Sequence, residues 1–123
     1  MNKLLTPLQG FYAMQLFLED YFRATSSDSL GALLSCMCFL DDGDTADPVL
    51  WIDWRAIVAD SPVTPMQAFQ AMKVFLDIYF QSTSSSNVKN LFHDIELVLE
   101  EQPGKEQIWQ KWMASTNLVL EHE

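Results

Sequence analysis

The chain has 123 residues, 49% of them hydrophobic and 20% charged, which argues against disorder and leaves enough chain to bury a core. Its 17 acidic and 7 basic residues give a formal charge of -10, which argues against nucleic acid or anionic membranes as partners and favours a basic one. The N-terminal stretch MNKLLTPLQGFYAM lacks a signal-peptide apolar region, and no run approaches the ~18 apolar residues of a membrane span, so we expect a cytoplasmic protein.

The sequence repeats itself. Residues 6–27, TPLQGFYAMQLFLEDYFRATSS, align without a gap with residues 64–85, TPMQAFQAMKVFLDIYFQSTSS. Pairing each residue from 5 to 58 with the residue 58 positions later gives 17 identities in 54 pairs, far more than unrelated sequence gives. We therefore predict a single domain, residues 1–123, that contains an internal duplication of residues 5–58 and 63–116.

The first predicted helix of each repeat begins at a Thr-Pro pair. Thr6 is placed to cap the helix, Pro7 suits the first helical position, and Gln9 completes a capping-box pattern that Thr64 and Gln67 repeat. Apolar residues then recur at helical spacing and form one face of an amphipathic helix. In the first repeat these are Phe11, Met14, Phe17, Leu18, Tyr21 and Phe22.

The second predicted helix follows the run Thr25-Ser26-Ser27, or Thr83-Ser84-Ser85 in the second repeat, which ends one helix and caps the next. In the first repeat we expect this helix to continue as far as Leu40. Cys36 and Cys38 would then point about 200° apart and could not pair, which fits a reducing compartment. We expect both to be buried as small apolar residues.

The third predicted helix starts at Asp47-Pro48, after an acidic linker, and carries Trp51 and Trp54 on one face. Trp109 and Trp112 repeat this spacing, so we expect the tryptophans to pack at the seam between the repeats. Strand signals are absent. The predicted fold is all-α, a six-helix bundle built from two pseudo-symmetric three-helix repeats.

Residues for catalysis are scarce. The chain has two histidines: His93 replaces Ser35 of the first repeat, and His122 lies in the terminal tail. A nucleophilic triad needs a histidine beside a nucleophile and an orienting acid, and a zinc site needs about four convergent ligands. We therefore expect neither an enzyme nor a bound metal or other cofactor, and keep an acid–base role of His93 as a minor alternative.

The acidic linker is the main candidate for a functional site. Its acids, with Gly43, resemble a calcium loop only superficially, because the twelfth residue from Asp41 is Ile52 and not glutamate. Two interpretations stay open: a solvated turn whose last acid caps a helix, or a patch that binds a basic partner. The candidate partner-binding residues are Asp41, Asp42, Asp44, Asp47, Asp53, Glu100 and Glu101.

Leu16 and Val74 occupy equivalent positions on the polar side of their predicted helices. Either a neighbouring helix covers that side as well, or the two residues belong to an exposed apolar patch.

The first repeat resembles a family of small acidic bacterial proteins, the immunity proteins of contact-dependent growth inhibition and related polymorphic toxin systems. The resemblance covers most of residues 4–58 and is looser in the second repeat. It rests on these residues: Thr6-Pro7-Leu8-Gln9, Phe17-Leu18-Glu19-Asp20-Tyr21, Ser27-Asp28, Asp42-Gly43, Ala46-Asp47-Pro48, and Trp51 with Trp54. The second repeat has Lys105-Glu106 in place of Asp47-Pro48, so a function of the linker would belong to the first repeat alone.

The resemblance implies a protein that binds the toxin domain of a cognate effector and blocks it. Many such toxins are basic nucleases, and the net charge of -10 suits a cationic partner. The alternative is a helical adaptor or structural interaction module with no toxin partner. A weak homo-oligomer stays open under either interpretation.

Overall fold

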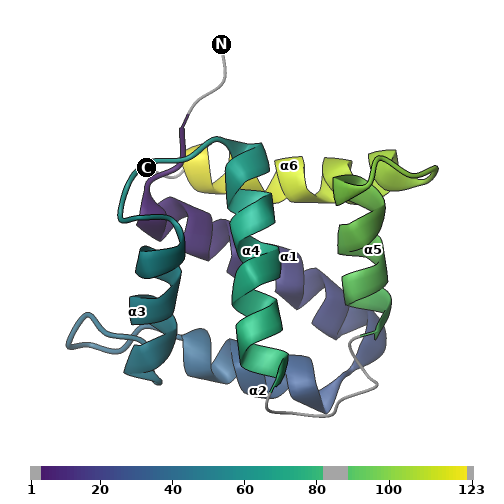
Figure 1. The fold of residues 1–123 in the computed structure, drawn as a ribbon. Coiled ribbons are helices and arrows are strands. Elements are labelled where there is room, and N and C mark those ends of the chain that lie inside the picture. The colour runs from purple at the N-terminus through teal and green to yellow at the C-terminus, as the bar shows by residue number, and fades with distance from the viewer. Residues whose placement is uncertain (1–3, 82–88, 122–123) are drawn as a thin grey trace.

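The structure is a computed structural model that describes the backbone of residues 4–81 and 89–121, and the side chains of residues 4–80 and 91–121. Within this part of the chain the secondary structure consists of six α-helices and two isolated β-bridges, and the all-α prediction is confirmed (Figure 1). The helices are α1 (Pro7–Thr25), α2 (Asp28–Met37), α3 (Pro48–Ile57), α4 (Pro65–Gln81), α5 (Lys89–Leu99) and α6 (Lys105–Glu121).

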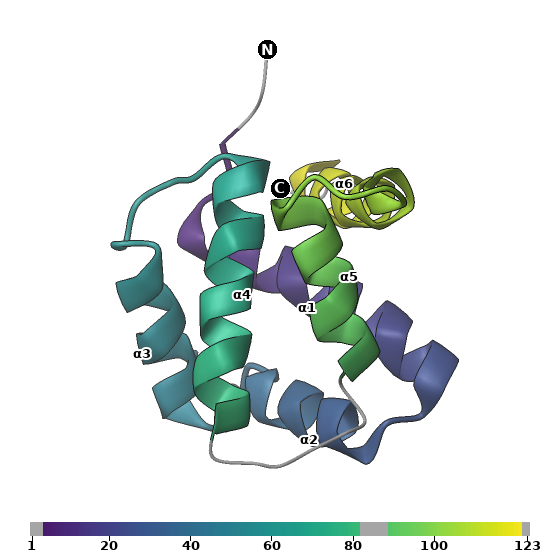
Figure 2. The same cartoon turned by 45° about the vertical axis from the view of Figure 1, so that its right-hand side comes forward.

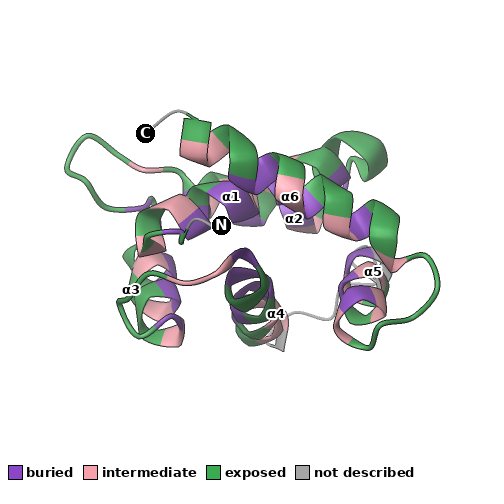
Figure 3. Cartoon of the chain, turned by 90° about the horizontal axis from the view of Figure 1, so that it is seen from above, coloured by how far each residue is buried: buried purple, intermediate pink, exposed green. Residues whose placement is uncertain are grey.

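The helices lie in two layers that cross steeply. Seen from above, α3, α4 and α5 stand end-on in one row, while α1 and α6 run lengthwise behind them (Figure 3). In the view of Figure 2, α2 lies across the lower ends of α4 and α5, and its neighbour within its own layer is α1. One cluster of buried side chains contains residues from all six helices, so both layers share a core.

The predicted capping boxes are present at the starts of α1 and α4. The Thr6 hydroxyl accepts a hydrogen bond from the backbone of Gln9 at 3.1 Å, and the Gln9 side chain accepts one from the backbone of Thr6 at 2.9 Å. Thr64 and Gln67 make the same two bonds at the same lengths. Both starts are therefore set by local sequence, because each cap satisfies donors that the first helical turn leaves free.

The end of α2 differs from the prediction. Ser26 ends α1 in a left-handed conformation and Ser27 caps α2 as expected, whereas the equivalent Thr83-Ser84-Ser85 lies outside the described residues. The helix ends at Met37 and does not reach Leu40, because the backbone amide of Leu40 bonds to the carbonyl of Asp44 at 2.7 Å instead of continuing the helical pattern. A short hairpin replaces the last predicted turn.

The tryptophans lie at the junction of the two layers. Trp54 and Trp112 are fully buried, and their indole N–H groups donate to the carbonyls of Pro7 and Pro65 at 2.8 and 2.9 Å. The predicted core position is confirmed for this pair, whose polar atoms have the partners that burial demands. Trp51 and Trp109 are only half-buried, at the edge of the core.

Several contacts recur 58 positions apart and join the two halves. Trp54 meets Phe75 with ring centroids 6.0 Å apart, and the equivalent pair, Phe17 with Trp112, is 5.7 Å apart. Leu5 and Val63, which are themselves equivalent, form a β-bridge with each other. These contacts agree with the predicted repeat where they occur. Pseudo-symmetry of the complete triplets stays a prediction, since α6 is much longer than α3.

Candidate partner-binding surface

The acidic linker forms a small hairpin between α2 and α3, which we call the acidic hairpin and define as residues 38–47. A bridge between Phe39 and Thr45 closes it, and Ala46 donates a backbone hydrogen bond to Cys38 at 2.7 Å. At the tip, Gly43 has a φ of 89°, a value that favours glycine, and donates to the carbonyl of Leu40 at 3.0 Å. The fold thus holds this loop in a defined shape through its own backbone bonds.

Three carboxylates project from the tip of the acidic hairpin. Asp41, Asp42 and Asp44 are exposed, and Asp42 accepts a hydrogen bond from the backbone of Asp44 at 2.9 Å. None of the three forms an ion pair with any residue that the structure describes. Their charges therefore add instead of being neutralised locally, which gives this corner of the molecule a strongly negative potential.

The other two predicted acids of the first repeat, Asp47 and Asp53, are less exposed than the tip acids. Asp47 is half-buried and caps α3, with its carboxylate accepting from the backbone of Val49 at 3.2 Å. A negative charge there also stabilises the helix through its dipole. Asp53 is half-buried and lies further along the same helix. The solvated-turn interpretation thus holds for Asp47, which caps α3, and in part for Asp42, which bonds to the backbone of Asp44; it assigns no structural role to Asp41 or to the carboxylate of Asp44.

The nearby arginine does not neutralise the hairpin. Arg55, on α3, makes two hydrogen bonds of 3.1 Å to the carboxylate of Asp60. These hydrogen bonds, and the positive charge of the guanidinium, lower the pKa of Asp60. Its guanidinium also lies 5.9 Å from the ring centroid of Trp51. Because Arg55 is engaged with its own neighbours, it is not available to the tip acids.

Exposed apolar side chains flank the acidic hairpin, and sequence reasoning missed them. Leu40 is 51% exposed on the hairpin, and Val49 and Ile52 on α3 are 55% and 61% exposed. The equivalent residues of the second half are the buried Val98 and the exposed Gln107 and Gln110. For Val49 and Ile52 the signal was present in the repeat, because the second copy has glutamine at both positions.

The second-half acids lie elsewhere. Glu100 and Glu101 belong to the α5–α6 loop, which Figures 1 and 3 place at the opposite end of the molecule from the acidic hairpin. Glu101 is also within 4.0 Å of the ammonium group of Lys105. The structure therefore brings four predicted acids together on one hairpin with Asp53 on the following helix, and it separates Glu100 and Glu101 from them.

The remaining chemical candidates are not assembled into a site. His93 is exposed on α5, and His122 lies outside the described residues. The prediction that both cysteines are buried is wrong: Cys36 is half-buried and Cys38 is exposed, because α2 ends early and Cys38 follows it. Among the residues that the structure covers, no group of three or more histidine, cysteine or acidic side chains could hold a metal ion.

Leu16 and Val74 resolve differently. Leu16 is half-buried beside Leu118 and Val119, since the last turns of α6 lie against this side of α1. Val74 is exposed on α4, as is Ile78 one turn later. Of the two alternatives that the sequence left open, cover by a neighbouring helix thus applies to Leu16 and an exposed apolar patch applies to Val74.

Comparisons with protein-family models, with curated proteins and with solved structures give no match. In the part of the chain that the structure describes, none of the helices has the length and apolar character needed to cross a membrane.

Proposed function

We propose that this chain is an immunity protein that binds and neutralises the toxin domain, a basic nuclease, of a cognate contact-dependent growth inhibition effector. The observation that carries the proposal is the acidic hairpin, on which Asp41, Asp42 and Asp44 project without ion-pair partners among the described residues. The sequence resemblance names the family, and the net charge of -10 supplies the complementarity.

The proposed mechanism has an electrostatic step and a packing step. The tip carboxylates attract the cationic face with which a nuclease holds phosphates, and they occupy positions that the nucleic acid would otherwise take. Apolar anchors then hold the complex, since a few buried side chains supply most of the binding energy in protein interfaces. Leu40, Val49 and Ile52 are exposed next to the acids and suit this part.

The half-to-half comparison supports the assignment of this role to the first half. Where the first half has the exposed Val49 and Ile52 and the half-buried Asp53, the second has the exposed Gln107, Gln110 and Lys111, an ordinary solvated helix surface. The two halves share the capping boxes at the starts of α1 and α4 and many core residues. Their outer surfaces differ around the acidic hairpin, as expected if only one of them meets the partner.

The direct test is co-expression with the toxic domain encoded immediately upstream of this chain. We expect growth to be restored, and an equimolar complex to be isolated with a toxin domain inactivated by mutation. A toxin of the same class from another system should still kill, which tests specificity. A neighbour that is not toxic, or that kills in spite of this chain, would contradict the proposal.

The second candidate is a helical adaptor without a toxin partner. It is favoured by the apolar face of α4, where Val74 and Ile78 are exposed one turn apart and far along the chain from the acidic hairpin. Replacing both by glutamine should abolish partner binding by an adaptor that uses this face and leave toxin neutralisation unchanged.

A further inference from the structure

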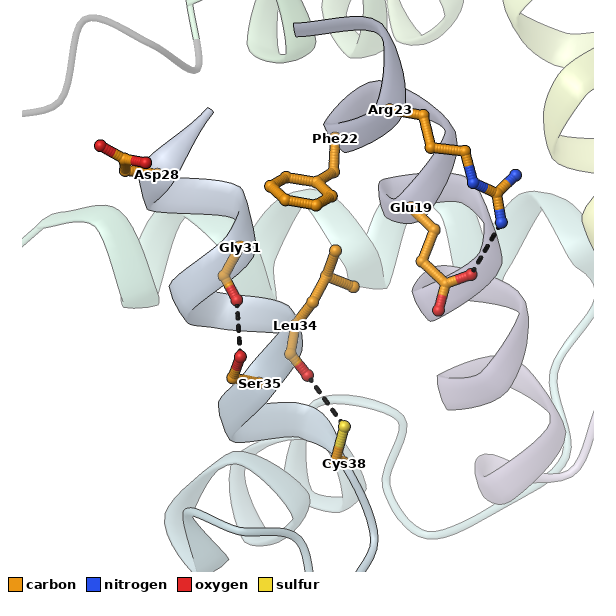
Figure 4. Close-up of a pocket in the computed structure, with 8 residues that line it drawn as sticks. All are labelled: Glu19, Phe22, Arg23, Asp28, Gly31, Leu34, Ser35 and Cys38. Atoms are coloured by element: carbon orange, nitrogen blue, oxygen red, sulfur yellow. Dashed lines mark hydrogen bonds and ion pairs between the residues drawn. The ribbon is translucent and has the colours of Figure 1, made fainter. Parts of the chain in front are cut away.

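A groove lies between the C-terminal half of α1 and the whole of α2. Its volume is about 690 Å³, and Phe22 of α1 and Leu34 of α2 point into the space between the helices (Figure 4). Phe22 was expected on the buried face of its helix, yet it is 37% exposed and forms one apolar wall. The groove ends at Cys38, whose exposed thiol donates to the carbonyl of Leu34 at 3.5 Å.

Small side chains on α2 keep the groove open. A Cβ atom on Gly31 would lie 2.9 Å from the ring of Phe22, so glycine is what allows this ring to lie over α2. In the second half, Phe92 replaces Leu34, and its ring meets that of Phe80 edge-to-face with centroids 5.9 Å apart. In the second half a ring thus stands at the position of Leu34 and contacts the equivalent of Phe22.

The rim of the groove carries a net negative charge. Glu19 and Arg23 on α1 form an ion pair at 3.6 Å and largely cancel each other. Asp28, at the start of α2, is exposed and has no ion-pair partner among the described residues. At the other end Cys38 is the first residue of the acidic hairpin, so the groove adjoins the base of the hairpin.

We propose that this groove receives an amphipathic basic segment of the same toxin domain, with apolar side chains seated against Phe22 and Leu34 and basic side chains facing Asp28 and the acidic hairpin. The inference rests on the proposed function and extends its interface from the hairpin onto the outer face of α1 and α2. Charge complementarity selects the occupant, because an uncharged or acidic segment would gain nothing from the flanking carboxylates.

The test places in the groove, at position 34, the phenylalanine that the second half has at the equivalent position 92. In Leu34→Phe the new ring takes the place that Phe92 has in the second half, so the fold should tolerate it. With the inactivated toxin domain as probe, we expect dissociation to be roughly tenfold faster and association to change little, since apolar contacts act mainly on residence time. The matched control, Phe92→Leu, should leave both rates unchanged.

A second measurement does not depend on a groove mutant. In a Cys36→Ser background, alkylation of Cys38 by iodoacetamide reports access to the end of the groove, and the inactivated toxin domain should slow it roughly tenfold, because buried interface atoms exclude solvent. An unchanged alkylation rate, or wild-type dissociation of Leu34→Phe, would overturn the groove proposal.

The failures of the two proposals are distinguishable. If the wild-type chain does not bind the neighbouring toxin domain at all, the proposed function fails. If it binds and neither groove measurement responds, only the groove is wrong. Sedimentation of the free chain tests a second copy as the occupant: a dimer that Leu34→Phe converts to a monomer would also overturn the assignment to the toxin.

Discussion

Tyr21 in the first half of the chain donates a hydrogen bond to the carboxylate of Asp94 in the second, with the two oxygens 2.5 Å apart. Tyr21 is buried, and the ammonium group of Lys111 lies 5.3 Å from its ring centroid. The equivalent of Asp94 in the first half is Cys36, so a carboxylate occupies this position only once. This hydrogen bond joins α1 to α5. Because a hydrogen bond has a preferred geometry, it specifies the relative position of the two helices in a way that apolar packing alone does not.

Removing the hydroxyl of Tyr21 should destabilise the fold. We expect Tyr21→Phe to lower the free energy of unfolding by about 1–2 kcal/mol, because the Asp94 carboxylate loses its donor. Tyr12→Phe is the matched control, since Tyr12 is exposed, and should stay within about 0.5 kcal/mol of wild type. Urea unfolding measures both, and equal losses for the two variants would contradict the prediction.

The same tyrosine should make stability depend on alkaline pH. Burial, with the hydrogen bond and charge of Asp94 and the charge of Asp20, raises the pKa of Tyr21 above its ordinary value of 10.0. The folded chain thus holds this proton more tightly than the unfolded chain does. This contribution is complete below about pH 10 and declines as the pH rises further. The stability difference between wild type and Tyr21→Phe, measured from pH 8 to 11, should narrow above pH 10.

The buried tryptophans should contribute more to the free energy of unfolding than their half-buried neighbours do. We expect Trp54→Phe and Trp112→Phe each to cost about 2–3 kcal/mol, because each leaves a cavity and removes the donor to a proline carbonyl. Trp51→Phe, at the edge of the core, should cost about 1 kcal/mol or less. Chemical denaturation tests the order, and a larger loss for Trp51→Phe would show that burial does not rank these sites.

Reversing the charge of the hairpin tip should slow association with the toxin domain. We expect the triple variant Asp41→Lys, Asp42→Lys, Asp44→Lys to lower the association rate constant roughly tenfold at low salt, because electrostatic steering is lost. Unfolding should be little changed, since these side chains make no ion pairs with described residues and the hydrogen bond that is lost, from the Asp44 backbone to Asp42, is exposed. Glu100→Lys with Glu101→Lys, at the far end, is the control. An equal effect there would mean that only the total charge matters.

Substitution of Gly43, with Gly104 as its control, tests the conformation of the acidic hairpin without changing its charge. Gly43 and Gly104 have φ angles of 89° and 94°, and a Cβ on either would meet no atom within 4 Å. Alanine at each should therefore cost a similar amount, about 1 kcal/mol, from backbone strain alone. Only Gly43→Ala should also weaken binding of the toxin domain. Surface plasmon resonance on both variants would reveal whether the hairpin conformation contributes.

The parts of the fold that depend on neighbouring residues were predictable. Thr6 and Gln9, and their counterparts Thr64 and Gln67, form the expected capping boxes because a cap involves residues only three positions apart. Leu40 was misplaced for the opposite reason. It continues the helical apolar pattern, and the backbone bonds of the acidic hairpin override that pattern.

The candidate surface was predictable only in its charges. Aspartates in a polar linker are nearly always solvated, so Asp41, Asp42 and Asp44 could be placed outside without a structure. Val49 and Ile52 could not, because an apolar residue on a helix can face either the core or solvent. The groove also needs the packing of α1 on α2, where Phe22 rests over Gly31.

The construction of the acidic hairpin has a consequence for how such a protein can diversify. The backbone bonds that shape its tip join residues 38–46, and on either side of the tip Phe39 is half-buried and Thr45 is buried. The tip between them, residues 40–44, is exposed, so its side chains can be exchanged without altering the residues that pack against the rest of the fold. Under the proposed function, new partner preferences can arise by changes at residues 40–42 and 44, while Gly43, Phe39 and Thr45 stay as they are.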